Sequence, residues 1–402
     1  MLLILAFIVF IYLAACVTYN LVLAIAGGLK QRSRLPYQDE TTFGRIAILI
    51  PAYREDEVII STVQSYQHLN YPAGKYEVVV IADSLQPATI ATLRELDVKV
   101  IEVSFEKSTK AKSLNVAFQQ LGDDYDMALI SDADNILAAD FLLKANYLYQ
   151  QGHEAIQGQR VAKNLDTPFA ILDAANEIIA NHLYRKGANA LGLSSSVIGS
   201  GMVFHYPMIK EILQEIQATG GFDKVLQLLV VERGVSIAYL EDAYVYDEKI
   251  AHSAVFENQR KRWIASQIVY LRTFWARGWK ALFKGQVNYF NLSVCQNALM
   301  PRMLLLFILT IGTLLSLVLK PYLGDAWWWM PVLFVLNAIT MLIPIPAKFF
   351  TNYLFTALLA MPKAVLIMVK LMFRLKGADK TFIHTKHTQT GINNPLLHAP
   401  GE

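Results

Sequence analysis

Two carboxylates separated by one residue follow an apolar run near the middle of the chain. The run Met127–Ile130 is typical of a buried strand, and Asp132 and Asp134 come just after its carboxyl end. In an extended backbone, residues two apart point to the same side, so both carboxylates could face one hard cation that also contacts a diphosphate. Asp is also common in turns and helix caps, so the triplet predicts a metal site only in combination with its neighbours.

Two further strand ends carry residues suited to binding a nucleotide. The apolar run Ile46–Ile50 leads into Pro51-Ala52-Tyr53-Arg54-Glu55-Asp56, and the run Glu77–Ile81 leads into Ala82-Asp83-Ser84. An aromatic ring with acids at one strand end and an Asp at the next could hold a base and its ribose, because a carboxylate accepts hydrogen bonds from hydroxyl and ring N–H groups. The alternative is that these acids only cap helices.

These strands belong to an alternating pattern that extends from Arg45 to about Ala251. Short β-rich runs, which also include Val98–Val103, alternate there with amphipathic segments. Such alternation predicts an α/β domain with a mostly parallel sheet and helices on both faces, whose ligands bind at the carboxyl ends of the strands. Lys110 begins a helix in this region, where a lysine can meet a diphosphate, although a solvated lysine is the more common case.

The composition indicates that part of the chain lies in a lipid bilayer. Of its 402 residues, 54% are hydrophobic and 17% are charged, which is too apolar for an ordinary soluble enzyme. The net charge of +3 is too small to predict a nucleic-acid partner. The two cysteines, Cys16 and Cys295, lie in apolar surroundings, which argues against a disulfide framework and a thiolate metal site.

The first apolar segment, Leu2–Leu29, is long enough to cross about 30 Å of hydrocarbon. No charged region precedes it and no clear small-residue cleavage site follows, so residues 1–30 are predicted to form an uncleaved transmembrane anchor. Lys30 and Arg32 follow at once, and the positive-inside rule places this end of the anchor in the cytoplasm. The domain at 40–263 is therefore expected to face the cytoplasm.

A basic turn, Arg260-Lys261-Arg262, precedes an amphipathic segment. Between Ile264 and Phe283, Trp275 and Trp279 alternate with arginines and a lysine. Such a helix is suited to lying in the headgroup region, so residues 264–300 are predicted to form interfacial helices. The turn itself is also typical of the cytoplasmic flank of a membrane helix.

Apolar runs continue through residues 301–375. Met303–Leu319 and Ala326–Ile343 are predicted to span the bilayer out and back. Phe349–Phe373 is interrupted by a proline and two lysines, and it is interpreted as one further short or interfacial segment. About three spans in all would leave the basic tail, 376–402, in the cytoplasm.

The order of these residues resembles the membrane-bound, inverting glycosyltransferases of family 2, the group that includes the processive cellulose, chitin and hyaluronan synthases. The resemblance extends from Ile46 to about Trp263 and continues loosely into the membrane segments. It rests on five ordered matches: Pro51-x-Tyr53, Asp83, Lys110 with Leu114-Asn115, Asp132-x-Asp134, and Gln259-x-x-Arg262-Trp263, of which the last is the most specific. The resemblance implies a Rossmann-like nucleotide-sugar domain of the GT-A type with transmembrane and interfacial helices.

The family's usual Thr-Glu-Asp triplet, whose Asp is the general base, is absent from this chain. Asp223 lies 36 residues before Gln259, near the family's spacing, and opens the apolar helix Val225–Glu232. Asp242 follows the strand-like run Ser236–Leu240 but lies only 17 residues before Gln259. The resemblance therefore implies Asp223 as the base, with Asp242 as the alternative. Asp223 could also be a helix cap, and a helix N-terminus favours the charged carboxylate that a base requires.

By the same resemblance, other positions receive roles in binding. The donor would meet the side chains at one end of the site: Pro51, Tyr53, Glu55, Asp83, Lys110, Asp132 and Arg262. Asp134, with Asp132 nearby, would hold Mg²⁺ or Mn²⁺. The acceptor would meet Gly201, Gln259 and Trp263, whose indole can stack on a sugar face. A plain glycine turn is an equal alternative for Gly201.

The tail carries one more resemblance. Thr381–Thr388 is similar to the segment that in relatives folds back near the active site as part of a gating loop. A disordered basic tail is the equal alternative.

The resemblance implies that a sugar is transferred, with inversion, from a nucleotide-diphospho-sugar, UDP-linked, to a growing polysaccharide. Two alternatives stay open: a single transfer to a lipid acceptor, and a noncatalytic nucleotide-binding partner, which the irregular acidic triplet motivates. The expected partners are the nucleotide sugar, a saccharide or lipid-linked acceptor, membrane lipids and, for a polymer, an export partner. We expect an integral protein of a bacterial inner membrane, with its catalytic domain in the cytoplasm.

Overall fold

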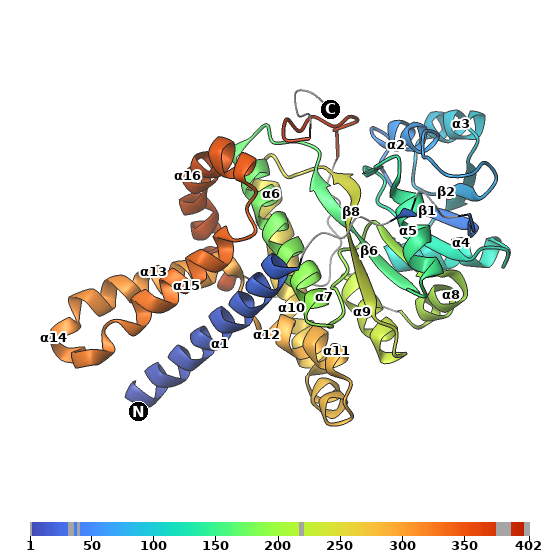
Figure 1. The fold of residues 1–402 in the computed structure, drawn as a ribbon. Coiled ribbons are helices and arrows are strands. Elements are labelled where there is room, and N and C mark those ends of the chain that lie inside the picture. The colour runs from blue at the N-terminus through green and yellow to red at the C-terminus, as the bar shows by residue number, and fades with distance from the viewer. Residues whose placement is uncertain (1, 31–35, 38–40, 217–220, 375–386, 398–402) are drawn as a thin grey trace.

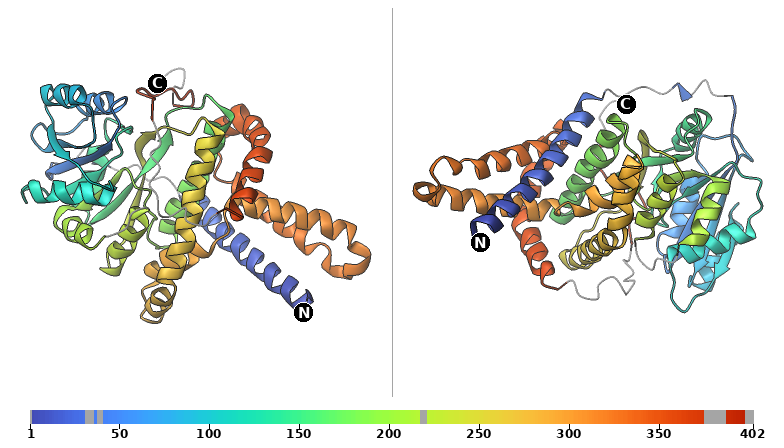
Figure 2. Two further views of the ribbon diagram at one scale, coloured as in Figure 1. Left: turned by 180° about the vertical axis from the view of Figure 1, so that it is seen from behind. Right: turned by 90° about the horizontal axis from the view of Figure 1, so that it is seen from below.

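The computed structural model describes the whole chain except residues 1, 31–35, 38–40, 217–220, 375–386 and 398–402 (Figure 1). An α/β domain lies on one side of the molecule, and helices from both ends of the chain project from its other side (Figures 1 and 2). Of the segment Thr381–Thr388, which is similar to a gating loop, residues 381–386 lie outside the described residues.

The α/β domain is built on one eight-stranded sheet in the order β3-β2-β1-β4-β7-β6-β8-β5. The strands are β1 (Ile46–Tyr53), β2 (Tyr76–Asp83), β3 (Lys99–Val103), β4 (Met127–Ile130), β5 (Ile136–Leu137), β6 (Ala155–Ala162), β7 (Met202–His205) and β8 (Ile237–Asp247). The first four in the sheet run parallel, as do β6 and β8, whereas β7 and β5 run against their neighbours. The predicted α/β class with a mostly parallel sheet is confirmed, and the two reversed strands make the sheet mixed.

Burial on both faces explains why these strands are continuous apolar runs. Along β1, Ile46, Ile48 and Ile50 pack into one core, while Ala47 and Leu49 pack into the other. The first core is covered by α2 (Ile59–Tyr66), α3 (Pro87–Glu95) and α5 (Phe141–Gln150), and the second by α4 (Lys110–Gln120), α8 (Tyr206–Glu215) and α9 (Phe222–Glu232). Successive strand residues point to opposite faces, so a strand covered on both sides has no position for a polar residue.

The register of the central strands brings the predicted polar residues to one edge. In the parallel pair β1 and β2, Tyr53 lies opposite Asp83, the last residue of each strand. β4 pairs with the other side of β1 and ends at Ile130, two residues before Asp132. Parallel strands bring their carboxyl ends together, so Tyr53, Asp83 and Asp132 lie at the same edge of the sheet.

A layer of helices stands between this sheet and the projecting helices (Figure 1). It consists of α6 (Pro168–Asn181), which continues through the π-helical turn His182–Gly187 and α7 (Ala188–Ala190), and of α10 (Ser253–Phe283). The predicted basic turn Arg260-Lys261-Arg262 is wrong in its local structure, because α10 is one unbroken helix of 31 residues. The boundary expected at 263/264 therefore falls inside a helix. The connection after α10 consists of α11 (Val287–Phe290), a π-helical turn at Asn291–Cys295 and α12 (Gln296–Ala298).

Two helices are long and apolar enough to cross a membrane, α1 (Leu2–Leu29) and α16 (Ala347–Met372). α13 (Arg302–Val318) is long enough only together with the preceding α11 and α12, from which it is bent by 52°. In the same way, α15 (Trp329–Leu342) is long enough only together with the preceding α14 (Lys320–Leu323), across a bend of 68°. The described residues thus contain two candidate spans, or up to four, where the sequence predicted about three.

The projecting helices divide into two groups. α1, α13 and α15 extend away from the α/β domain around a shared apolar core that includes Leu13, Val17, Leu305 and Leu309 (Figures 1 and 2). α16 instead lies against α6 through a separate core. The segment expected to be short because of Pro362 is a continuous helix of 26 residues with that proline inside it. Pro362 removes one backbone hydrogen bond from this helix, which packs on α6 through that core.

Candidate active site

One cavity of about 1120 Å³ connects the edge of the sheet with the base of the projecting helices. At one end it is lined by residues at or just after the carboxyl ends of β1, β2 and β4. At the other end it is lined by residues around the start of α13, among them Leu299, Arg302 and Met303. α6 and α10 contribute to the wall between these ends. The cavity is therefore large enough for a nucleotide sugar together with an acceptor, because small-molecule pockets measure about 300–1000 Å³.

The end of the cavity at the sheet edge contains an acid with an unpaired buried oxygen. Pro51, Tyr53, Glu55 and Asp83 all line the cavity. The Asp83 side chain is buried, and its Oδ1 accepts a hydrogen bond of 3.0 Å from the Ser84 hydroxyl. Its Oδ2 is buried and has no hydrogen-bond partner among the described residues. A buried acceptor of this kind suits a ligand N–H or O–H group, because burial without a partner is unfavourable.

Lys110 connects three parts of the site. It is the first residue of α4, its Nζ pairs with Asp132 and it donates a hydrogen bond of 2.6 Å to the Gly199 carbonyl. The same Nζ lies 5.5 Å from the centre of the Phe222 ring. Because Phe222 directly precedes Asp223, this contact places the start of α9 beside the end of β4.

Asp134 is almost completely buried, with 2% of its surface exposed. Its Oδ2 accepts a hydrogen bond of 3.3 Å from the Glu248 amide, and its carbonyl accepts one of 2.7 Å from Lys163 Nζ. Burial raises the pKa of the Asp134 carboxyl above its usual value. A buried carboxylate of this kind is stabilised by a cation.

The tail supplies one cationic neighbour. His387 Nδ1 lies 3.1 Å from Glu55 Oε1, and the Thr388 and Gln389 amides donate to Glu248 Oε2. Burial alone would lower the pKa of His387, but Asp134 and Glu55 outweigh it and raise that pKa to about 10. His387 is therefore positively charged at neutral pH.

The acids fit a divalent metal only in part. Among the described residues, no group of three or more His, Cys, Asp or Glu side chains is arranged to hold a metal. Mg²⁺ is commonly held by one or two carboxylates, with substrate phosphates and water completing its shell. Asp134 and Asp132 both offer carboxylate oxygens in the cavity wall, so the residues present fit such an ion if substrate phosphates and water complete its shell.

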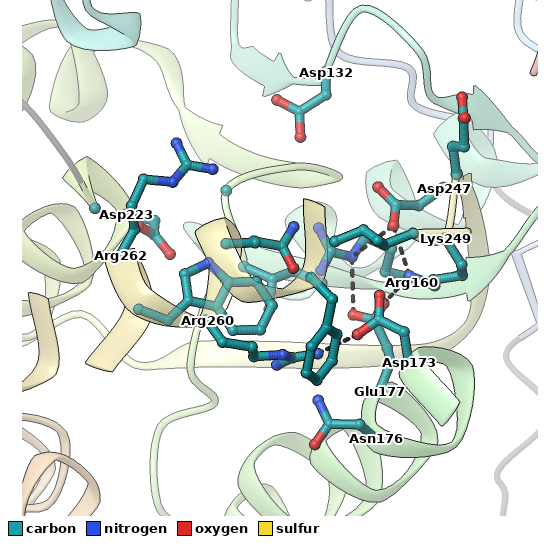
Figure 3. Close-up of a pocket in the computed structure, with 18 of the residues that line it drawn as sticks. Asp132, Arg160, Asp173, Asn176, Glu177, Asp223, Asp247, Lys249, Arg260 and Arg262 are labelled. Atoms are coloured by element: carbon teal, nitrogen blue, oxygen red, sulfur yellow. Dashed lines mark hydrogen bonds and ion pairs between the residues drawn. The ribbon is translucent and has the colours of Figure 1, made fainter. Parts of the chain in front are cut away.

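Asp223 lies in the first turn of α9 and lines the cavity. Gly221, just before that helix, has a φ of +62°, and a Cβ there would lie 3.1 Å from the Tyr270 ring. Figure 3 shows Asp223 and Arg262 on one wall of the cavity, with Asp132 also pointing into it. The structure thus brings Asp223 together with the donor-type residues.

Asp242 lies elsewhere. It is in the middle of β8, where its carboxylate is 3.7 Å from Lys144 Nζ, and the described residues that line the cavity do not include it. β8 continues past Asp242 because a register shift at Gly158/Gln159 lets β6 keep pairing with it as far as Asp247. Asp247, at the end of this strand, does line the cavity. Leu240, Ala243 and Val245 are buried, but their spacing is irregular across the register shift, so no regular sequence pattern extends the strand to Asp247.

The Gln-x-x-Arg-Trp residues project from the middle of α10. Gln259, Arg262 and Trp263 line the cavity, and Gln259 Oε1 is buried without a hydrogen-bond partner among the described residues. Arg260 lies between the Phe256 and Trp263 rings, 4.8 and 4.3 Å from their centres, and pairs with Asp173. Arg260 therefore holds the indole in place by cation–π stacking.

Gly201 is not among the described residues that line the cavity, although its neighbour Gly199 is. It has a φ of +62°, and a Cβ there would lie 2.4 Å from Val245 Cγ2. Its carbonyl accepts a hydrogen bond of 2.9 Å from the Gly158 amide. Glycine at this position is explained by backbone conformation and close packing, which corresponds to the glycine-turn alternative.

A profile of the family described as "Glycosyltransferase like family 2" matches residues 44–266, more than half of the chain. The chain belongs to glycosyltransferase family 2. It is accordingly an enzyme of the transferase class with a GT-A-like fold, as the resemblance implied. Its place among the cellulose, chitin and hyaluronan synthases stays a prediction.

Individual relatives of this family 2 glycosyltransferase are distant. A "Dolichyl-phosphate hexose transferase" of Haloferax volcanii is 24% identical over 207 residues, covering 51% of this chain and 85% of that protein. A "Beta-monoglucosyldiacylglycerol synthase" of Trichormus variabilis is 24% identical over 227 residues, covering 54% of this chain and 48% of its own. The mannosyltransferase PcManGT of Pyrobaculum calidifontis, solved with GDP-Man and Mn²⁺, superposes with a TM-score of 0.46 and 16% identity over 91% of this chain and 97% of its own.

A buried charge network in this glycosyltransferase was not expected from its sequence. Glu177 on α6 pairs with Arg160 on β6 and with Lys249, and Asp247 pairs with the same two cations. Burial alone would raise the pKa of Glu177, but Arg160 and Lys249 lower it below its usual value. Through these ion pairs, Glu177 links α6 to β6 at Arg160 and to Lys249, just after the end of β8 (Figure 3).

Glu177→Gln is expected to lower the stability of the protein by about 3–5 kcal/mol, because one buried anion then faces two buried cations. Since the folded-state pKa of Glu177 is depressed, its contribution is present above the unfolded value near 4.5 and is lost as the pH falls below it. Thermal unfolding in detergent between pH 7 and 3 should show a lower Tm and a weaker pH dependence. Glu215→Gln, which breaks an exposed pair with Arg233, is the control and should change little. Equal effects of both substitutions would contradict the assignment.

Proposed function

We propose that the protein transfers a sugar, with inversion, from a nucleotide-diphospho-sugar, UDP-linked, to a hydroxyl group of a lipid acceptor at the membrane surface. The main support for this proposal is that one cavity extends from the sheet edge to the base of α13. It is lined at the sheet edge by Asp83, Asp132, Asp134 and Asp223. Donor and acceptor could therefore meet in one space that begins above the sheet edge and ends beside helices long enough to enter a bilayer.

Donor binding would use the residues at the strand ends. The buried Oδ2 of Asp83 would accept a hydrogen bond from the base, beside Pro51, Tyr53 and Glu55. The diphosphate would lie between Lys110 and Arg262, whose positive charges oppose the negative charge that develops on the leaving group. Mg²⁺ or Mn²⁺ held by Asp134, with Asp132 nearby, would add a Lewis acid at the same place.

The transfer would use Asp223 as the base. Its carboxylate removes the proton of the acceptor hydroxyl while that oxygen forms a bond to the anomeric carbon. The bond between the anomeric carbon and the diphosphate oxygen breaks, and the nucleoside diphosphate leaves with the bonding electrons. Attack from the face opposite the leaving group inverts the configuration. Gln259 and Trp263 would orient the acceptor on the α10 wall, the indole by stacking.

A lipid acceptor is favoured by the far end of the cavity. Leu299, Met300, Met303 and Met368 line it there, and such apolar side chains suit an acyl or prenyl chain better than a polysaccharide. In addition, Leu13, Val17, Leu305, Leu309 and Leu333 fill the contact between α1, α13 and α15. A polymer would need a path past these side chains.

A processive synthase is the second candidate. Gln259, Arg262 and Trp263 all line the cavity from one helix, and this is the motif on which the resemblance to the polysaccharide synthases mainly depends. For either acceptor we propose an integral protein of a bacterial inner membrane with the α/β domain in the cytoplasm. The basic residues Lys30, Arg32 and Arg34 after α1 support this orientation.

The test is a screen of radiolabelled UDP-sugars with the purified full chain in vesicles of phosphatidylcholine and phosphatidylglycerol, with Mg²⁺ or Mn²⁺. We expect metal-dependent release of UDP and label in low-mass products that extract into organic solvent. Long water-soluble chains at low turnover would instead identify a polysaccharide synthase. Nucleotide binding without UDP release from any donor would support the noncatalytic alternative and would contradict the proposal.

A further inference from the structure

Several charged side chains in the wall of the cavity are balanced by a neighbour of opposite charge. Arg160 and Lys249 face Glu177 and Asp247, so two cations meet two anions. Arg260 and Asp173 form a further pair. The charges of these groups cancel one another, so none of them is available to bind a charged ligand. This agrees with the rule that buried charges are paired.

Arg302 is an exception. It is the first residue of α13, and its Nη2 donates to the carbonyl and to the side-chain oxygen of Asn176, at 2.8 and 2.6 Å. Both acceptors are neutral. Its Nη1 is buried and has no hydrogen-bond partner within the described part of the chain, where Arg302 also has no carboxylate within ion-pair distance.

Arg185 also lacks an ion-pair partner among the described residues. Only 4% of its surface is exposed, yet its Nε donates to the Ser196 carbonyl at 3.2 Å and its Nη1 to Asn181 Oδ1 at 2.9 Å, both neutral acceptors. No carboxylate of the described chain forms an ion pair with it. Burial lowers the pKa of Arg185 to about 10, with Arg302 acting in the same direction and Glu177 against it.

Both arginines contact α6, Arg302 from the start of α13 and Arg185 from the π-helical turn His182–Gly187. Their hydrogen-bond partners Asn176 and Asn181 are both on α6. Arg302 also lies over the ring of Tyr184, 5.4 Å from its centre, and Tyr184 directly precedes Arg185 in the chain. Leu299, Met303 and Met368 line the same end of the cavity. Figure 3 shows Asn176, which Arg302 contacts, at the opposite end of the drawn cluster from Asp132.

We propose that Arg185 and Arg302 bind the phosphate group of a phosphate-bearing lipid, which is the acceptor. Guanidinium groups form charge-assisted, paired hydrogen bonds with phosphate, and two of them here have no anion of their own. The apolar chain of the lipid leaves past Met303 and Met368 towards α13, and its hydroxyl group extends towards Asp223. The inference rests on the proposed function and narrows the acceptor from any lipid to one that carries a phosphate.

The test is binding, measured as the rise in Tm of the full chain in dodecyl maltoside on addition of dihexanoyl phosphatidic acid. Wild type, Arg302→Gln and Arg302→Lys are compared with Arg277→Gln, which alters an exposed arginine of α10 paired with Glu232. Wild type and Arg277→Gln should respond equally, Arg302→Gln should bind at least about tenfold more weakly, and Arg302→Lys should lie between them. Dihexanoylglycerol, which has no phosphate, should raise the Tm of none of them.

Three results would overturn the proposal. One is a wild type that does not respond to phosphatidic acid, or an Arg302→Gln variant that responds fully. Another is an equal response to inorganic phosphate at the same concentration, since the site would then hold a free anion. The third is an Arg302→Gln variant that no longer responds to UDP with Mn²⁺, because Arg302 would then belong to the donor site. Retention of that UDP response shows that the variant is folded. UDP release, measured separately on the same preparation, tests the transferase activity itself.

Discussion

Asp223→Asn is expected to lower kcat by about a thousandfold, within the range of 10²–10⁴ that a positioned general base contributes. Asparagine has nearly the size of aspartate but cannot take the proton of the acceptor hydroxyl. The donor residues of β1, β2 and β4 are unchanged, so binding of the nucleotide sugar should stay close to wild type. The measurement is single-turnover formation of the glycosylated product with saturating donor, together with the dissociation constant for UDP.

Asp242→Asn is the matched control, because it makes the same chemical change on β8 outside the cavity. Its partner is Lys144, 3.7 Å away, which also pairs with Asp140 at 2.7 Å and therefore keeps one carboxylate. We expect this variant to retain nearly full activity. Loss of activity in Asp242→Asn with normal activity in Asp223→Asn would make Asp242 the base, and normal activity in both would contradict the mechanism.

The sequence allows the donor end of the site to be predicted because few arrangements of its elements are possible. Apolar runs buried on both faces must be central strands, and parallel strands place their carboxyl ends at one edge. Asp83 and Asp132 follow such strands, so they had to meet. The same argument applies to Lys110, which opens a helix immediately before β4.

The acceptor end depends on contacts between residues far apart in the chain. Arg302 meets Asn176 of α6 without any local sequence pattern that predicts this pair. The predicted strand Ser236–Leu240 was too short. A register shift at Gly158/Gln159 lets β8 continue through Glu241 and Asp242, although two consecutive acids are typical of a strand end. Pairing geometry of this kind is set by the partner strand and not by the sequence of β8 itself.

Local rules also misjudged two helical segments. Three consecutive basic residues suggested a turn, yet α10 continues through them, because Arg260 is held by Asp173 and stacked between Phe256 and Trp263. Pro362 suggested a break, yet α16 continues because α6 covers one of its faces. Arg and Lys are also good helix formers, so only Pro362 opposes its helix, by about 3 kcal/mol.

Asp134→Asn is expected to reduce turnover by about a thousandfold, because loss of several kcal/mol of charge stabilisation in the transition state corresponds to that factor. Asp134 is the buried member of the pair, and burial raises the pKa of its carboxyl, so a nearby cation stabilises its charged form. Asparagine supplies an oxygen without the charge. The variant should also lose the dependence of UDP binding on Mn²⁺, which can be measured by calorimetry with and without the metal.

Asp132→Asn separates the two acids, because Asp132 is more exposed and already pairs with Lys110. If Asp132 contacts the ribose, this variant should bind UDP more weakly in the presence and absence of Mn²⁺ alike, while the stimulation by metal remains. An Asp134→Asn variant whose UDP binding still tightens with Mn²⁺ to the wild-type extent would show that the metal is held by other groups. If Asp132→Asn abolished the effect of Mn²⁺ and Asp134→Asn did not, Asp132 would be the metal ligand. The location of the site would stay the same, because both residues come after β4 and line the same cavity.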